Sequence, residues 1–463
     1  MTTPRKQSDL LSDVGRMATD QTLADLEASE RRRPGAVGRV IVYFDGFIRD
    51  EPDYLRQYGT LADHRAAIES AAEDLRAQTQ EATREFLLHN SKARDAFAGT
   101  GFAFEPAIHV ESLATPNVIF TPANLALAKE IARLPEVVAI CNDQPMATMS
   151  WGGGQFLPEP MGDHKDGYTW GWNFLGIPEI HHNEKLRGDD VVIGMVDSGI
   201  CSGHPDLNGK IAEFSTFDPI TRKFESAVHV DPTGHGTRIG GILVGGKNSG
   251  CQIGGAPNSR LAVVSVDTRS GEARLFSRYI KAVEHLTRSN RDYEVKLVNV
   301  SLGVEPQNVR KSDLDLHAYS IEQILRRKVL IIAAIGNYPK KRLIPAQLPG
   351  ILSAGAHHPN CRRWAENGKK PSLFLPGTST FSSWPVKGPG ASVTKDLHHF
   401  YEGCSSAATA HLTAIAALIT QKFKQIGPED VADALRRTAS WRRFPSLKRA
   451  LVHLEAKYGK PSP

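Results

Sequence analysis

The sequence lacks several features that mark whole classes of protein. No stretch approaches roughly eighteen consecutive apolar residues, so we expect no membrane-spanning helix. The 463 residues contain only five cysteines, an odd and sparse set that gives no disulfide framework and favours free thiols in a reducing compartment. A net charge of +5 over this length does not indicate nucleic-acid binding. The N-terminal residues lack the apolar core of a secretory signal, and we therefore expect a cytoplasmic protein.

The first 145 residues divide into a polar arm and a small α/β unit. Residues 1–38 are polar, with a basic run before Pro34, and we expect a solvated arm or loose helix. Residues 39–145 alternate β-type and helical patterns, which predicts a small domain whose sheet is covered on one face. Its expected elements are a strand at 39–47, an amphipathic helix at 61–86, a strand at 107–113, a helix capped by Thr121 with Pro122 in its first turn, and a strand at 136–143.

The rest of the chain reads as a linker and one large domain. Residues 146–169 are rich in Gly, Pro and Met without periodicity, which is typical of a linker. From residue 170 to 463, near-continuous apolar runs such as "DDVVIGMVD" and "KVLIIAAIGN" alternate with helical stretches. Such runs are typical of a parallel sheet buried on both faces. The pattern predicts a doubly wound α/β fold whose functional groups lie at the carboxyl ends of its strands.

Three residues at those strand ends and helix starts have the types needed for nucleophilic catalysis. Asp197 closes the strand "VVIGMVD", His235 stands between two glycines where a helix begins, and Ser405 follows "EGC" at the start of an apolar helix. An imidazole activates a serine hydroxyl when a carboxylate fixes its tautomer, and a helix N-terminus supplies N–H groups to an oxyanion. The alternatives are a turn-forming Asp and a structural His.

Asn337 is the candidate for a second oxyanion donor. It directly follows Gly336 after the buried strand "KVLIIAAI", so it is expected at the same edge of the sheet as the three residues above. An Asn after Gly also forms turns on its own account. Its position beside the other candidates favours a side-chain amide that donates to developing negative charge.

These motifs together resemble those of subtilisin-like serine proteases, the subtilase family, over residues 170 to about 439. The matching stretches are "VDSGICSGHPDL", "GHGTRIGGIL", "NVSLG", "AAIGN" and "GCSSAAT". The Asp, His, Ser chain order is that of subtilisin. The resemblance implies a triad of Asp197, His235 and Ser405, with Asn337 in the oxyanion hole. It further implies that Ser301, Leu302 and Gly303 pair with an extended peptide.

The sequence departs from the family pattern at the serine motif. Cys404 stands where the family has Thr, and Thr409 stands where it has Pro. We expect activity to survive both changes, with Cys404 either an inert packed thiol or a site sensitive to oxidation. The insertion at 357–377 has Cys and His without metal-ligand spacing and reads as a surface loop. No cofactor and no metal site is expected from the sequence, with calcium left open. Calcium is common in the family, but we find no loop with convincing oxygen-ligand spacing.

The resemblance implies an endopeptidase acting on protein or peptide substrates through an acyl-enzyme intermediate. Subtilases often carry an N-terminal β-α-β-α-β prodomain that assists folding and occupies the cleft, and residues 39–145 have that element order. We therefore expect this unit to hold the protease in check. The alternatives are a catalytically silent relative that binds peptides, and a conditional protease of a regulatory or defence system that an unidentified partner relieves.

Overall fold

The computed structural model describes two compact units, the first within residues 1–144 and the second taking most of residues 145–463. The described residues are 7–33, 36–44, 111–112, 118–133, 137–143, 146–148, 167–217, 224–266, 276–288, 292–304, 321, 324–325, 327–337, 339, 343–364, 367–368, 370–385 and 397–460. The helix expected at 61–86 and most of the strand expected at 107–113 lie outside these residues. Among the described helices, none is long and apolar enough to cross a membrane.

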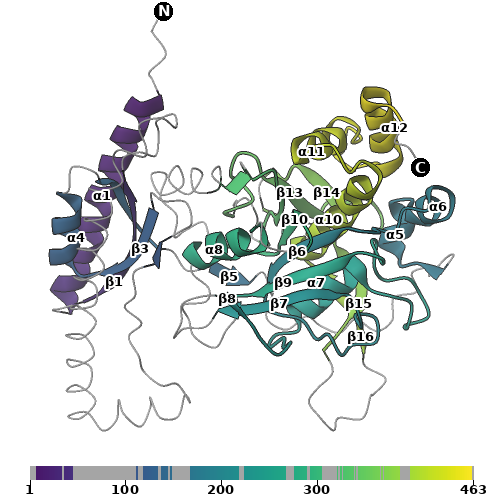
Figure 1. Cartoon of the computed structure of the whole chain (residues 1–463), viewed down its shortest axis with the longest axis horizontal. Coiled ribbons are helices and arrows are strands. Elements are labelled where there is room, and N and C mark those ends of the chain that lie inside the picture. The colour runs from purple at the N-terminus through teal and green to yellow at the C-terminus, as the bar shows by residue number, and fades with distance from the viewer. Residues whose placement is uncertain are drawn as a thin grey trace, which may run out of the picture. The chain divides into compact units, whose positions relative to one another are not determined.

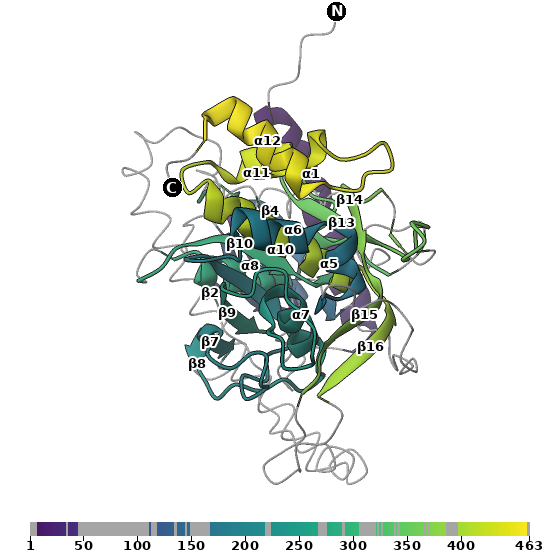
Figure 2. The same cartoon turned by 90° about the vertical axis from the view of Figure 1, so that its right-hand side faces the viewer.

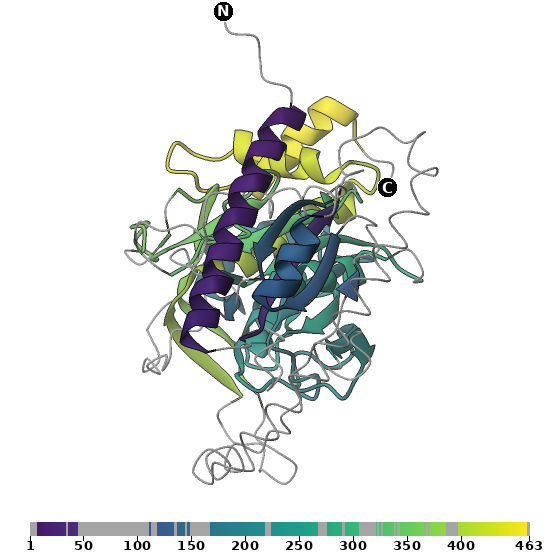
Figure 3. The same ribbon diagram turned by 90° about the vertical axis from the view of Figure 1, so that its left-hand side faces the viewer.

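In the described residues, the first unit is an antiparallel sheet of four strands in the order β2-β3-β1-β4, packed against two helices (Figures 1 and 3). Its elements are α1 (Gln7–Arg32), β1 (Gly38–Phe44), β2 (Glu111–Ser112), β3 (Val118–Ala123), α4 (Leu125–Ala132) and β4 (Val137–Asn142). Figure 3 shows α1 and α4 side by side on the sheet. The strands expected from the runs at 39–47 and 136–143 are confirmed.

The expectation of a solvated arm or loose helix was right only in that the segment is helical, and the cap expected at Thr121 was wrong. The supposed arm is the 26-residue helix α1, whose Ala18 and Leu26 are buried and whose Thr19 hydroxyl accepts a hydrogen bond from Ile140 N at 3.0 Å. Apart from Leu26, the buried positions described in this helix are small residues, which a polar composition conceals. Thr121 does not cap a helix, because it lies in β3 opposite Val40. The cap of α4 is Asn124, whose side-chain oxygen accepts from the backbone N–H of Leu127 at 2.9 Å.

The second unit contains an eight-stranded sheet in the order β14-β13-β12-β10-β6-β9-β7-β8. All neighbouring strands are parallel except β7 and β8, which pair antiparallel at one edge. The strands are β6 (Val192–Asp197), β7 (Ile211–Phe217), β8 (Phe224–Ser226), β9 (Arg260–Ser265), β10 (Val295–Val300), β12 (Leu330–Ala334), β13 (Leu352–His357) and β14 (Leu373–Pro376). The doubly wound α/β fold read from the apolar runs is confirmed. β14 corrects the surface-loop reading of the insertion, whose last apolar run is an edge strand.

Helices cover both faces of this sheet, which is why its central strands are apolar throughout. Along β6, Ile193 and Met195 join the core formed with α7 (His235–Val244) and α10 (Ser405–Lys422). Gly194, between them, faces Leu286 of α8 (Phe276–Leu286) on the opposite side. Figure 1 shows α8 and α10 on opposite sides of the sheet.

The region around the candidate residue Ser405 forms a ribbon followed by a buried helix. Strands β15 (Thr378–Ser383) and β16 (His398–Gly403) pair antiparallel and run as a two-stranded ribbon beside α7 (Figure 2). Helix α10 begins directly after β16, and its side chains are buried from Ser405 through Ile419. In the described residues, this unit also contains the helices α5 (Trp170–Phe174), α6 (Ile177–Glu179), η3 (Ile180–Glu184), α11 (Pro428–Arg437) and α12 (Leu447–Tyr458).

Candidate active site

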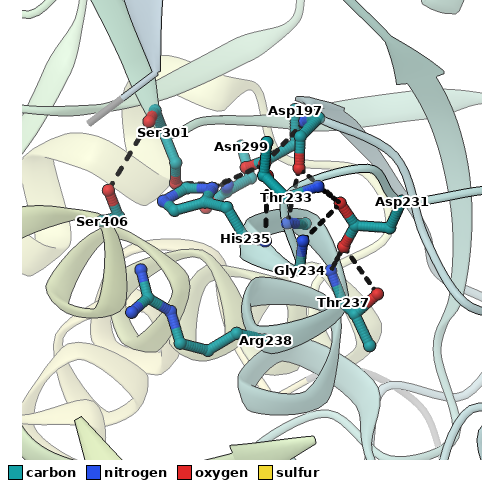
Figure 4. Close-up of polar contacts among 12 residues, drawn as sticks. Asp197, Asp231, Thr233, Gly234, His235, Thr237, Arg238, Asn299, Ser301 and Ser406 are labelled. Atoms are coloured by element: carbon teal, nitrogen blue, oxygen red, sulfur yellow. Dashed lines mark hydrogen bonds and ion pairs between the residues drawn. The ribbon is translucent and has the colours of Figure 1, made fainter. Parts of the chain in front are cut away.

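Asp197 and His235 form a buried ion-pair geometry at the end of β6. His235 Nδ1 lies 2.6 Å from Asp197 Oδ1, which also accepts from the backbone N–H of Ser198 at 2.7 Å (Figure 4). Both side chains are almost wholly buried. A carboxylate at Nδ1 holds the ring so that Nε2 is the nitrogen free to take a proton. Within the described part of the chain, His235 Nε2 has no hydrogen-bond partner.

Two glycines bring His235 up to Asp197. The N-cap residue Gly234 has φ +78°, which favours glycine, and α7 begins at His235. A Cβ on Gly236 would lie 1.9 Å from the carbonyl oxygen of Gly199, two residues after Asp197. The two backbones therefore touch, and no side chain fits between them. This close approach is the physical reason for the Gly-His-Gly pattern.

Asp231 ties the loop after β6 to the first turn of α7, and sequence reasoning missed it. Its Oδ1 accepts from Ser198 Oγ at 2.7 Å and Gly234 N at 3.0 Å. Its Oδ2 accepts from the N and Oγ1 of Thr237, at 2.7 and 2.6 Å (Figure 4). Asp231 thus holds both segments that carry Asp197 and His235. The available signal was an Asp three residues before a glycine-rich helix start, a common capping arrangement.

Ser405 is the first residue of α10, where its side chain is buried beside Asn337. The N-cap Cys404 accepts through Sγ from Ala407 N at 3.4 Å, as the family's Thr would do through oxygen. Ser405 Oγ donates to Asn337 Oδ1 at 2.8 Å and accepts from Gly336 N at 3.1 Å. The backbone N–H of Ser405 donates to the same Asn337 oxygen at 2.9 Å.

The orientation of Asn337 differs from the expected donor role. Its side-chain oxygen, rather than its amide N–H, faces Ser405. This oxygen accepts the hydrogen bond from the Ser405 backbone N–H. An oxyanion would need that same N–H together with an amide donor. In this state, the hydroxyl of Ser405 is bonded to Asn337, and no hydrogen bond between Ser405 and His235 occurs among the described residues.

Packing of α7 against α10 brings the Asp197–His235 pair close to the Ser405–Asn337 pair. Arg238, three residues after His235, donates to Cys404 Sγ at 3.6 Å, one residue before Ser405. The next serine, Ser406, is directed elsewhere, because its Oγ donates to the carbonyl oxygen of Ser301 at 3.5 Å (Figure 4). The first turns of both helices therefore meet at one place.

The predicted peptide-binding strand already has a partner. Strand β11 (Leu302–Val304) pairs antiparallel with β5 (Met146–Thr148), with Leu302 opposite Thr148 and Gly303 opposite Ala147. Ser301 precedes this ladder and is not paired in it. The linker reading of residues 146–169 was therefore wrong for its first three residues. They form a strand, although their sequence carries no periodic signal.

One set of side chains suited to a metal ion is present in the described residues, against the expectation of none. His204, Asp206 and His398 bring their ligand atoms within 4.8 Å of one another. Sequence spacing could not reveal it, because Asp206 and His398 are 192 positions apart. The five cysteines are all free, in keeping with the reading of their number.

Comparisons with known proteins agree with this geometry. The model of the subtilase family matches residues 188–460. The thermostable alkaline protease of Halalkalibacterium halodurans is 27% identical over 286 residues, covering 61% of this chain and 72% of that protein. The subtilisin of Bacillus pumilus is 28% identical over 277 residues, covering 58% and 91% respectively.

A solved structure has the same fold. Fervidolysin from Fervidobacterium pennivorans, a keratinolytic enzyme related to subtilisin, superposes with a TM-score of 0.63 at 16% identity. The match covers 90% of this chain and 61% of fervidolysin, so this chain spans less than two thirds of that protein. The family match extends over more than half of the chain and over every candidate site residue. The chain belongs to the subtilase family and is a serine endopeptidase.

Proposed function

We propose that this endopeptidase cleaves peptide bonds with Ser405 as nucleophile, His235 as general base and Asp197 as the carboxylate that orients it. The 2.6 Å contact between His235 Nδ1 and Asp197, with Nε2 left without a partner among the described residues, supports these roles. Rotation of the Ser405 side chain away from Asn337 delivers its hydroxyl to Nε2.

The reaction then follows from the proton positions. Ser405 Oγ attacks the scissile carbonyl carbon while its proton moves to His235 Nε2. The carbonyl oxygen becomes an oxyanion that accepts from the Ser405 backbone N–H and from the Asn337 amide once that amide has turned. The C–N bond breaks, and His235 gives its proton to the leaving amine. Water repeats the sequence on the acyl-enzyme and regenerates the Ser405 hydroxyl.

The N-terminal unit inhibits this reaction in our proposal, and the pairing of β5 with β11 is the observation that supports it most directly. Residues 146–148 directly follow the unit and add a strand to Leu302–Val304, the strand that resembles the family's peptide-binding strand. A substrate that binds by strand addition needs the same backbone groups. A peptide enters only when β5 leaves.

Addition of the N-terminal fragment in trans tests this role. Residues 150–463 are assayed on a generic peptide substrate, alone and with a fragment of residues 1–148, and a fragment ending at 145 is the matched control. The first fragment should inhibit, and the shorter one should inhibit less because it lacks β5. If neither fragment slows hydrolysis or raises the yield of folded protease, the unit is a docking domain for another protein.

A conditionally activated protease is the second candidate, and the contact between Ser405 and Asn337 favours it. A hydroxyl bonded to an amide oxygen instead of to His235 is not yet activated. An activating partner would then act by displacing β5 and allowing Asn337 to turn. Rapid labelling of the isolated full chain by a fluorophosphonate would exclude such a requirement.

A further inference from the structure

A buried cluster of two imidazoles and one carboxylate lies at the base of the β15–β16 ribbon. His204 and Asp206 are fully buried in the loop after β6, and the His398 side chain of β16 is 12% exposed. His398 Nε2 is hydrogen-bonded to Asp206 Oδ2, and His204 Nδ1 lies 3.9 Å from the same oxygen. The two imidazole rings meet edge to face, 5.0 Å apart. The two imidazoles therefore converge on one carboxylate oxygen of Asp206.

The hydrogen bonds made by the outer atoms of His204 and Asp206 resemble those that usually support metal ligands. His204 Nε2 donates to the carbonyl oxygen of Leu397 at 2.7 Å, so Nδ1 carries the lone pair, which accepts from Asp206 N–H at 3.1 Å and becomes available to a metal when that bond is released. Asp206 Oδ1 accepts from the backbone N–H of Asn248 at 2.8 Å and from its side-chain amide at 3.1 Å. Oδ2 thereby becomes the carboxylate oxygen that faces the two histidines. Such outer hydrogen bonds fix the tautomer and the orientation of a ligand.

We propose that His204 Nδ1, Asp206 Oδ2 and His398 Nε2 bind one zinc ion, with water as the fourth ligand. Two imidazole nitrogens and one carboxylate oxygen are a donor set that zinc prefers, whereas calcium takes about six to eight oxygens. Binding replaces two contacts seen here, the bond between His398 and Asp206 and the 3.1 Å bond from Asp206 N–H to His204 Nδ1. The proton on His398 Nε2 is released to solvent as the metal binds.

The position of the cluster gives the metal a structural role. Asp206 belongs to the segment that follows the catalytic strand β6, and Asn248 follows the helix α7 that begins at His235. His398 opens β16, which leads directly into Ser405. Zinc would join these segments at one point, so it should raise the unfolding temperature whether or not peptide is cleaved.

Metal binding by the full chain carrying Ser405→Ala, which prevents self-digestion, tests this inference. The protein is stripped with a chelator, titrated with Co²⁺ while visible absorption is recorded, and then loaded with Zn²⁺ and gel-filtered. The comparison variant is His398→Ala. The matched control is His182→Ala, which removes an exposed imidazole in η3.

The parent and the His182→Ala control should each retain one zinc and show the intense absorption bands of tetrahedral cobalt. Zinc affinity of His398→Ala should fall by roughly a hundredfold, and zinc should raise its melting temperature less. Failure of the parent to retain zinc, or equal affinity in His398→Ala, overturns the assignment. Where His398→Ala does not fold, the absence of tetrahedral cobalt bands in the parent also overturns it.

Discussion

Ser405 Oγ lies 2.8 Å from Asn337 Oδ1, while the nearby His235 Nε2 is buried and has no partner among the described residues. In this state, neither Ser405 Oγ nor His235 Nε2 is bonded to the partner that our proposal gives it in catalysis. An unpaired buried nitrogen has a free-energy cost of about 1–3 kcal/mol, which a rotated Ser405 hydroxyl would remove. In our proposal, this gain offsets part of the cost of breaking the bond between Ser405 and Asn337.

Ser405→Ala should abolish peptide hydrolysis and leave the fold intact, because only the attacking hydroxyl is lost. His235→Ala should be nearly as severe, and the double variant no worse, because the members of a triad act as a unit. Steady-state hydrolysis and circular dichroism measure the two properties. The matched control is Ser406→Ala, whose hydroxyl contacts Ser301 O instead. Labelling of Ser406 by a fluorophosphonate, mapped by peptide mass, would contradict the assignment.

Asn337→Ala should lower kcat by about a hundredfold or more with little change in KM. The magnitude is the one known for the corresponding donor in subtilisin. The amide acts on charge that develops in the transition state, so its loss spares ground-state binding. Full kinetic curves on one peptide separate the two constants. An unchanged kcat with a raised KM would mean that Asn337 only shapes the loop after β12.

Asp231→Asn should slow both peptide hydrolysis and fluorophosphonate labelling by up to about a hundredfold. The amide presents N–H groups where Ser198, Gly234 and Thr237 now donate, so the loop and the first turn of α7 lose their common acceptor. A purely structural effect would lower stability without changing the labelling rate of the folded fraction. Asp433→Asn, which alters an exposed pair on α11, is the control and should match the parent.

The stability of the protein should fall as the pH drops from about 6.5 to about 4. Burial lowers the pKa of His181 and of His357 from 6.5 to about 4, and that of His411 to about 3. Below pH 6.5, these histidines bind protons in the unfolded chain but remain neutral in the folded chain. Each histidine then weakens folding by up to about 1.4 kcal/mol per pH unit.

Urea unfolding of Ser405→Ala at pH 7.5 and pH 5 measures this slope. His357 lies between aromatic rings, with centroids 4.6 Å from both Phe174 and Phe444, so His357→Phe keeps similar packing without a titrating group. That variant should show a smaller pH dependence. Equal slopes in the two proteins would show that His357 takes no part.

The sheet and the contact between Asp197 and His235 could be predicted from the sequence because their determinants are local. Apolar runs indicate strands buried on both faces, and the Gly-His-Gly pattern indicates a close backbone contact such as that between Gly236 and Gly199. The role of Asp231 and the cluster at His398 were not readable, because each depends on segments that only folding brings together. The packing of helix α1 was not predicted for another reason, since Ala18 and Thr22 bury a small surface that composition does not report.

The complete burial of α10 from Ser405 through Ile419 also determines how the enzyme is inactivated. Backbone amides in such a helix exchange with solvent deuterium only when the whole unit opens, so Ser405 lies on one of the last elements to open. A protease is exposed to other copies of itself, and a neighbour can cut only chain that has opened. Loss of activity by mutual digestion should then follow the rate of global unfolding, and a copy that remains folded should keep its full catalytic power.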